Sequence, residues 1–100
     1  MTGTFDYYDG TLEKKTGVCD QNMDDLLNTE QIYLTPPDKR GKRVLLARSR
    51  GSIGVKALVM AQSGEHVWKE SPSGRLTARG ILHKNNDPTD VRRENLIFKN

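Results

Sequence analysis

The C-terminal part of the chain contains the pattern that most restricts how it can fold. Two short apolar runs, Ile81-Leu82 and Leu96-Ile97-Phe98, enclose a polar loop rich in asparagine, aspartate and proline. Short polar side chains such as Asn85, Asp87 and Asp90 hydrogen-bond readily to nearby backbone groups. The stretch therefore predicts two short apolar segments joined by a loop that its own side chains hold in shape.

The size and composition of the chain predict a single domain over residues 1–100. A chain of 100 residues buries roughly two thirds of its unfolded surface, which is enough for one core. Hydrophobic residues make up 34% and aromatic residues 6% of the chain. This hydrophobic share is higher than that of a disordered chain, but it is low for a core and predicts only modest stability.

Cysteine content and hydropathy predict a cytoplasmic protein. Cys19 is the only cysteine, so the fold does not depend on a disulfide. No run approaches the ~20 apolar residues of a membrane-spanning helix, and residues 1–10 lack the pattern of a signal peptide. We expect no membrane association.

Charge is divided unevenly along the chain. Residues 1–32 carry seven acidic side chains and two lysines, a net charge of −5, while the remaining residues carry 14 basic and six acidic side chains, a net charge of +8. We divide the chain accordingly into an acidic segment, residues 1–37, and a basic part, residues 38–100. Clustered basic side chains attract a phosphate backbone, although they also occur on ordinary solvated surfaces.

Local patterns predict short elements. Residues 1–17 have turn residues at Asp9-Gly10 and Thr16-Gly17 and read as irregular chain with a possible hairpin. Apolar spacing predicts a short helix over Met23 to Gln31, capped by Asp20 or Asn22. The rest of the pattern favours a strand over Arg43 to Arg48, and a strand continuing into a buried helix over Ile53 to Gln62.

The stretch from Ile81 to Leu96 resembles the signature of small phage-type HNH endonucleases. The matching positions, without gaps, are His83, Asn85, Asp87, Pro88, Asp90, Arg92, Glu94, Asn95 and Leu96. Tyr7 to Lys14 and Lys39 to Met60 are similar, more weakly, to upstream parts of the same family. The resemblance implies a ββα-type hairpin and a phage or mobile-element origin in a bacterial host.

The resemblance also implies catalytic roles for two residues. Phosphodiester hydrolysis needs a base to activate water, a divalent cation, and a group that holds the base in one tautomer. The family's general base maps onto His83, and the asparagine that orients it maps onto Asn95. His83 and Asn95 are equally compatible with a structural role in the loop.

The metal site of the family is incomplete in this sequence. The family takes one ligand from the residue before the base, where this chain has Leu82, and another from a helix that follows the orienting asparagine, whereas the sequence ends at Asn100. We therefore expect no metal site and no cofactor. A divalent metal such as magnesium, which prefers oxygen ligands, would be needed only by an active enzyme.

The expected phosphate contacts are basic residues of the central turns, which would hold them in one neighbourhood. They are Arg40, Lys42, Arg43, Arg48 and Arg50. A solvated basic face is the alternative. Trp68 is interpreted as a packing residue, or as an exposed contact for nucleic acid or protein.

We expect a small α+β fold, with an HNH-like hairpin that lacks the final helix, short helices and an antiparallel strand pair. Two function classes remain open. In the first, a degenerate HNH-like protein binds nucleic acid without efficient cleavage, or binds and inhibits a nucleic-acid-processing or defence protein of the host. In the second, the chain is an active nicking endonuclease that uses a divalent metal.

Overall fold

The structure, a computed structural model, describes residues 2–10 and 13–99 and has the expected α+β class. Its strands are β1 (Thr2–Asp9), β2 (Glu13–Asp20), β3 (Ile32–Leu34), β4 (Leu45–Ala47), β5 (Ile53–Gly54), β6 (Trp68–Glu70), β7 (Leu76–Ala78), β8 (Ile81–His83) and β9 (Leu96–Phe98). Its helices are α1 (Asp24–Asn28), α2 (Val55–Gln62) and the single 3₁₀ turns η1 (Gln21–Met23), η2 (Arg48–Arg50) and η3 (Arg93–Asn95).

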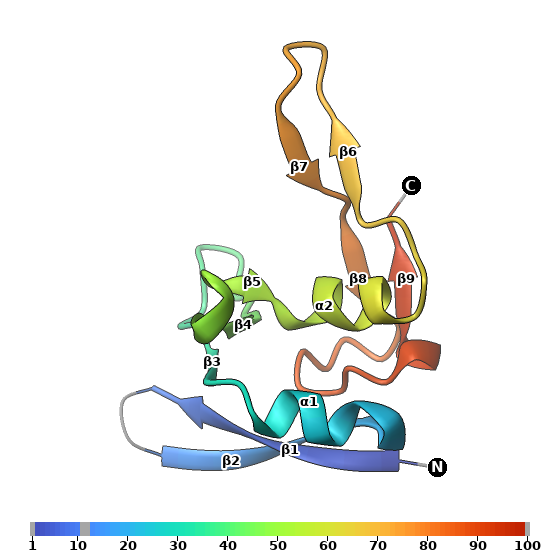
Figure 1. The fold of residues 1–100 in the computed structure, drawn as a ribbon. Coiled ribbons are helices and arrows are strands. Elements are labelled where there is room, and N and C mark those ends of the chain that lie inside the picture. Colours follow the sequence, from blue (N-terminus) through green and yellow to red (C-terminus); the bar gives the residue numbers. More distant parts are fainter. Residues whose placement is uncertain (1, 11–12, 100) are drawn as a thin grey trace.

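Five strands form a mixed sheet in the order β2-β1-β3-β4-β5. Only β1 and β3 are parallel, and the other neighbours run antiparallel. Two further antiparallel pairs, β6–β7 and β8–β9, stand apart from this sheet (Figure 1). The expected antiparallel strand pair and C-terminal hairpin are therefore present.

The N-terminal hairpin is more regular than the sequence predicts. β1 and β2 pair over their whole length, from Thr2 opposite Asp20 to Asp9 opposite Glu13. The turn expected at Asp9-Gly10 does follow β1, and Gly10 adopts φ +74°, but the turn expected at Thr16-Gly17 is wrong because both residues lie within β2. Gly17 is needed there for space: a Cβ atom would lie 2.5 Å from the Phe5 ring and 2.8 Å from the Thr89 carbonyl oxygen.

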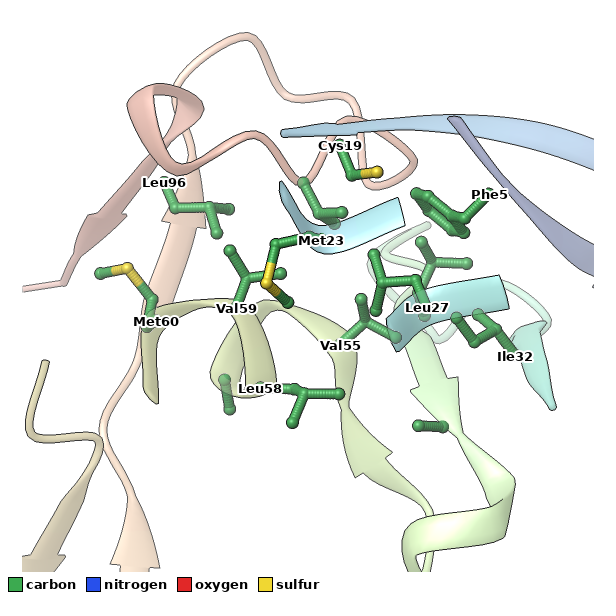
Figure 2. Close-up of a cluster of buried hydrophobic side chains, with 14 of the residues drawn as sticks. Phe5, Cys19, Met23, Leu27, Ile32, Val55, Leu58, Val59, Met60 and Leu96 are labelled. Carbon is green, nitrogen blue, oxygen red and sulfur yellow. The ribbon is translucent and has the colours of Figure 1, made fainter. Parts of the chain in front are cut away.

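The hydrophobic core lies between this sheet, the two helices and the C-terminal hairpin (Figure 2). Alternate residues of β1 point inward, among them Phe5 and Tyr7. Five of the eight residues of α2 are buried, so it is a central helix rather than an amphipathic surface helix. The prediction of a strand that continues into a buried helix over residues 53–62 is confirmed.

The predicted helix over Met23 to Gln31 is too long. Only Asp24–Asn28 is α-helical, and the helix closes with tighter bonds from the Thr29 amide to the Leu26 carbonyl and from the Glu30 amide to the Leu27 carbonyl. Asn28 binds the edge of β1 by donating to the Thr4 carbonyl and accepting from the Asp6 amide, and the Thr29 hydroxyl donates to the Leu26 carbonyl. Neither expected N-cap residue acts as one: Asp20 makes no capping bond to η1, and Asn22 lies inside it.

The predicted strand over Arg43 to Arg48 is shorter in the structure. β4 spans only Leu45–Ala47, since Val44 donates its amide to the Thr35 hydroxyl and the chain turns into η2 at Arg48. No helix among residues 2–10 and 13–99 has the length and apolar character needed to cross a membrane.

The close approach of Gly17 to Phe5 and Thr89 generates a prediction. Gly17→Ala forces its new methyl group against an aromatic ring and a backbone oxygen, and we expect it to lower the free energy of unfolding by about 1–3 kcal/mol. Urea unfolding measures the effect. Thr16→Val, at an exposed position of the same strand, is the control and should stay within about 0.5 kcal/mol of the parent. Equal stability of both variants would contradict this packing.

Candidate functional site

The residues of the HNH-like stretch lie on the β8–β9 hairpin and the loop that joins its strands. His83 ends β8 and pairs with Leu96, the first residue of β9. Beyond this pair, the Lys84 amide donates to the Asn95 carbonyl at 2.7 Å. Asn95 itself is buried, with 5% of its surface exposed, so its side chain points into the loop rather than into solvent.

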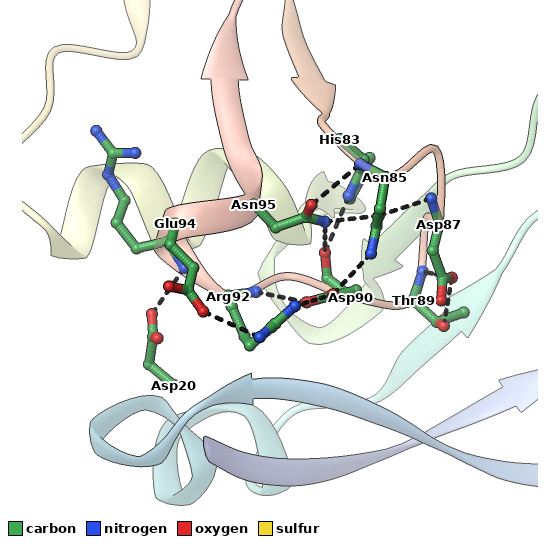
Figure 3. A network of polar contacts seen from close by, with 10 residues as sticks. Asp20, His83, Asn85, Asp87, Thr89, Asp90, Arg92, Glu94 and Asn95 are labelled. Atoms are coloured by element: carbon green, nitrogen blue, oxygen red, sulfur yellow. Dashed lines mark hydrogen bonds and ion pairs between the residues drawn. The ribbon is translucent and has the colours of Figure 1, made fainter. Parts of the chain in front are cut away.

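Asp90 is the centre of the hydrogen bonds in this loop (Figure 3). Its carbonyl oxygen accepts from Asn95 Nδ2 at 2.9 Å and lies 3.1 Å from His83 Nδ1. Its carboxylate accepts from Arg92 Nε at 2.8 Å, from Arg92 Nη2 at 2.7 Å and from Asn85 Nδ2 at 2.9 Å. The Arg92 guanidinium holds the pKa of the Asp90 carboxyl below its usual value of 3.8.

The expected Asx-type bonds of the loop are confirmed. The side chains of Asn85, Asp87 and Asp90 each accept from the backbone amide two residues further on, at 3.0, 2.9 and 3.3 Å. Asn86 takes the left-handed conformation, with φ +60°, which asparagine tolerates better than most residues. The short polar side chains therefore replace regular secondary structure in shaping this loop.

The loop is also bound to the N-terminal hairpin. Val18 of β2 donates its amide to the Thr89 carbonyl at 3.0 Å and accepts from the Val91 amide at 2.8 Å. Asp20, at the end of β2, accepts from the Arg93 amide at 2.8 Å. Asp20 occupies the N-cap position of η1 without a side-chain capping bond, because its carboxylate binds the Arg93 amide of the C-terminal loop instead.

His83 is held in one tautomer. A carbonyl oxygen only accepts hydrogen bonds, so the Asp90 carbonyl requires the proton on His83 Nδ1 and leaves the lone pair on Nε2. Burial lowers the pKa of His83 below 6.5, and the nearby Lys56 lowers it further, against the raising effect of the Asp90 bond. Asn95 orients His83 indirectly, because both side chains bind the same carbonyl oxygen rather than each other.

A groove of about 590 Å³ runs beside His83. It is lined by the basic residues Lys42, Arg43, Lys56 and Lys84, by His83, and by apolar side chains that include Leu82 and Ile97. Arg43 forms an ion pair with Asp9. Within residues 2–10 and 13–99, the three lysines have no carboxylate at ion-pair distance, so the groove presents unneutralised positive charge.

The structure does not bring the five expected phosphate contacts into one cavity. Lys42 and Arg43 line the groove, whereas Arg48 lines a second cavity. Arg50 Nε is 2.6 Å from a carboxylate oxygen of Glu30, and Arg40 belongs to the turn whose amides are bound by Asp38. The acidic and basic parts of the chain therefore neutralise each other at Arg43 and Arg50.

Two groove residues, Lys56 and Lys84, are not among the phosphate contacts expected from the sequence. Lys56 is the single charged residue in the apolar run that forms α2, and Lys84 directly follows His83. Burial lowers the pKa of Lys56, and Lys42 lowers it further. The sequence feature that could have identified Lys56 is a single lysine in an apolar helical run. Such a lysine either extends its charged end into a groove or loses hydration on burial, which is unfavourable.

Leu82 lies directly before His83, where the resemblance implies a metal ligand. It lies opposite Ile97 on the outer face of the hairpin, and both side chains are more than 40% exposed. Among the residues that the structure describes, no three His, Cys, Asp or Glu side chains gather as they would around a metal ion.

Trp68 lies on the β6–β7 hairpin, which extends away from the core (Figure 1). It is 41% exposed, so the interpretation as a core packing residue is wrong. Arg79 fixes the base of this hairpin: it donates to the His66 carbonyl at 2.8 Å, and its guanidinium carbon lies 3.7 Å from the centre of the Phe98 ring.

No family model, curated protein sequence or solved structure matches this chain.

The position of Asp90 generates a prediction. Asp90→Asn removes the charge that binds Arg92 while keeping the side chain's shape, and we expect a loss of about 1–3 kcal/mol in the free energy of unfolding at pH 7. The folded pKa is lowered, so this contribution is complete above the unfolded value near 3.8 and disappears as the pH falls through the lower folded value. The difference in thermal unfolding between parent and variant should therefore shrink as the pH falls below 3.8 and through the lower folded pKa of Asp90.

Glu94→Gln is the matched control for this variant. Glu94 binds the same guanidinium through Arg92 Nη1 at 2.9 Å but its side chain is 74% exposed, so its removal should cost less than about 0.5 kcal/mol. If Glu94→Gln were as destabilising as Asp90→Asn, the loop would not depend on the buried carboxylate.

Proposed function

We propose that this chain is a degenerate HNH-like protein that binds nucleic acid through the groove beside His83, without efficient cleavage, in the cytoplasm of a bacterial host. The observation that carries the proposal is the set of lysines at one groove, Lys42, Lys56 and Lys84, without carboxylate partners in the described part of the chain. A nucleic-acid backbone offers the matching charge, and its binding releases condensed counterions.

The arrangement of basic side chains around the groove supports a phosphate backbone as its ligand. Its basic side chains come from three elements: the turn before β4, the first turn of α2 and the loop after β8. Positive charges from separate rigid elements contact successive phosphates without reading the bases. The proposed binding is accordingly insensitive to sequence.

The hydrogen-bonded loop supports this function by fixing one wall of the groove. Asp90 holds His83, Asn85 and Arg92, and the loop is bound to β2 on its other side. Lys84 follows His83 directly, so the same bonds place its backbone. In this proposal His83 and Asn95 build the site, and the lysines supply the binding energy.

A working endonuclease is the second candidate, and one observation favours it. His83 is neutral near pH 7 and carries its lone pair on Nε2, as a general base requires. Against it, Leu82 offers no donor atom at the position where the resembled family holds its divalent metal, which there activates the attacking water and stabilises charge on the phosphate.

Duplex binding provides the first test. We expect Lys42→Ala with Lys84→Ala to weaken binding to unrelated DNA duplexes alike, and to reduce the slope of log affinity against log salt by about two. Fluorescence anisotropy at several salt concentrations measures both quantities. Arg50→Ala is the control: its charge is already paired with Glu30, so we expect a slope close to that of the parent.

The same experiment decides between nucleic acid and a protein partner. If the parent protein binds duplex DNA and RNA no better than the double variant at low salt, the groove is not a nucleic-acid site. The acidic first third would then favour a host nucleic-acid-processing protein as the partner, such as a defence nuclease that the chain blocks.

Plasmid nicking tests the second candidate. We expect no conversion of supercoiled plasmid to the nicked form with magnesium or manganese, because Leu82 cannot hold either ion. Nicking by the parent that disappears in His83→Ala would establish the endonuclease and refute the loss of cleavage. Nicking that persists in His83→Ala would identify a contaminating nuclease instead.

A further inference from the structure

A second candidate site lies on the outer face of the five-stranded sheet. In the strand register Tyr8 of β1 stands beside Tyr33 of β3, and Tyr33 stands opposite Leu46 of β4. Residues that face each other across neighbouring strands share a side of the sheet. The inward residues of β1 and β3 fill the core, so this row of side chains lies on the opposite, outer side.

The two tyrosines line a cavity that is separate from the groove beside His83. Its volume is about 590 Å³, and its lining also includes Gly10, Gln31 and Arg48. This volume lies within the range of ligand pockets of roughly 300–1,000 Å³. Tyr8 is 44% exposed, and the Tyr33 hydroxyl donates to the Ser52 hydroxyl at 3.3 Å, so one ring is accessible and the other is held in place.

The charges around this cavity favour an anionic ligand. Arg48 has no ion-pair partner among residues 2–10 and 13–99, whereas the nearby acids are neutralised: Asp9 binds Arg43 and Lys15, and Glu30 binds Arg50. Two aromatic rings with an unneutralised guanidinium combine a stacking surface with a phosphate contact. An apolar ligand would explain the rings but not Arg48.

We propose that this cavity binds an unpaired base of single-stranded nucleic acid. The base stacks on Tyr8 or Tyr33, Arg48 contacts a neighbouring phosphate, and the Gln31 amide is available to the edge of the base. Tyr8 and Tyr33 are in register on adjacent strands, which lie ~4.8 Å apart, so both side chains project from the same side of the sheet and line the same cavity. A duplex does not use this site, because its bases are stacked on each other.

The inference goes beyond the function proposed for the groove, since it concerns different residues and a different form of nucleic acid. Binding of a fluorescent dT12 strand and of a 12-base-pair duplex is measured at one low salt concentration. We expect Tyr8→Val to weaken dT12 binding about tenfold, the loss of roughly one stacked base, with duplex binding unchanged. Tyr8→Phe, which keeps the ring, should restore dT12 binding.

A control and a direct measurement keep the test independent of folding. Thr4→Val changes an exposed residue on the same side of β1 and should leave both ligands unaffected, and thermal unfolding verifies each variant. Photo-crosslinking of a 5-iodouracil strand, followed by mass spectrometry, should identify Tyr8 or Tyr33. Unchanged dT12 binding in Tyr8→Val, or crosslinks confined to other residues, would overturn the inference.

The outcomes separate the two proposals. If dT12 binding depends on Lys42 and Lys84 but not on Tyr8, the groove is supported and the tyrosine site is refuted. If dT12 binding depends on Tyr8 while the duplex is not bound, the tyrosine site is supported and the duplex-binding groove is refuted. Absence of binding to both strands and duplexes refutes both.

Discussion

The hydrogen bonds made by Asp90 hold together the loop between β8 and β9, which forms one wall of the candidate site. One residue supplies a carbonyl oxygen to His83 and Asn95 and a carboxylate to Arg92 and Asn85. Its neighbours on either side, Thr89 and Val91, bond to Val18 of β2. The loop has almost no regular secondary structure, so these bonds fix both its shape and its attachment to the N-terminal hairpin. Asp90 is nearly buried, which strengthens each of its interactions and makes an unpaired group there costly.

The second constraint is the distribution of charge. The acidic first third does not stay apart from the basic remainder, because Asp9 and Glu30 bind Arg43 and Arg50 across the sheet. These pairs neutralise Arg43 and Arg50, while the groove lysines, Arg48, and Lys39 and Arg40 of the turn before β4 have no ion-pair partner among the described residues. The places where a phosphate would meet unneutralised charge are therefore fewer, and better defined, than the net charge of the sequence indicates.

Much of the fold was predictable from the sequence, and the misses have physical causes. The α+β class, the strand and helix over residues 53–62 and the Asx-type bonds of the loop depend on local patterns, and all are confirmed. Gly17 looked like a turn residue because its role depends on the Phe5 ring and the Thr89 carbonyl, which are distant in sequence. The helix ends at Asn28, whose side chain bonds to the backbone of β1 at Thr4 and Asp6, a long-range contact that local patterns do not reveal. The same distinction applies to the candidate site. His83, Asn95, Lys42 and Arg43 could be predicted from the sequence, whereas Lys56 reaches the groove only because of where α2 lies in the fold.

The central claim is that the groove beside His83 binds a nucleic-acid backbone, and the most direct measurement is to record ¹H–¹⁵N NMR spectra of the labelled protein while a short DNA duplex is added. The account predicts that the largest shifts occur at Lys42, Lys56 and Lys84 and at the loop after His83, and that raising the salt concentration reverses them. Shifts confined to residues away from this groove, or no shifts at low salt, would contradict it.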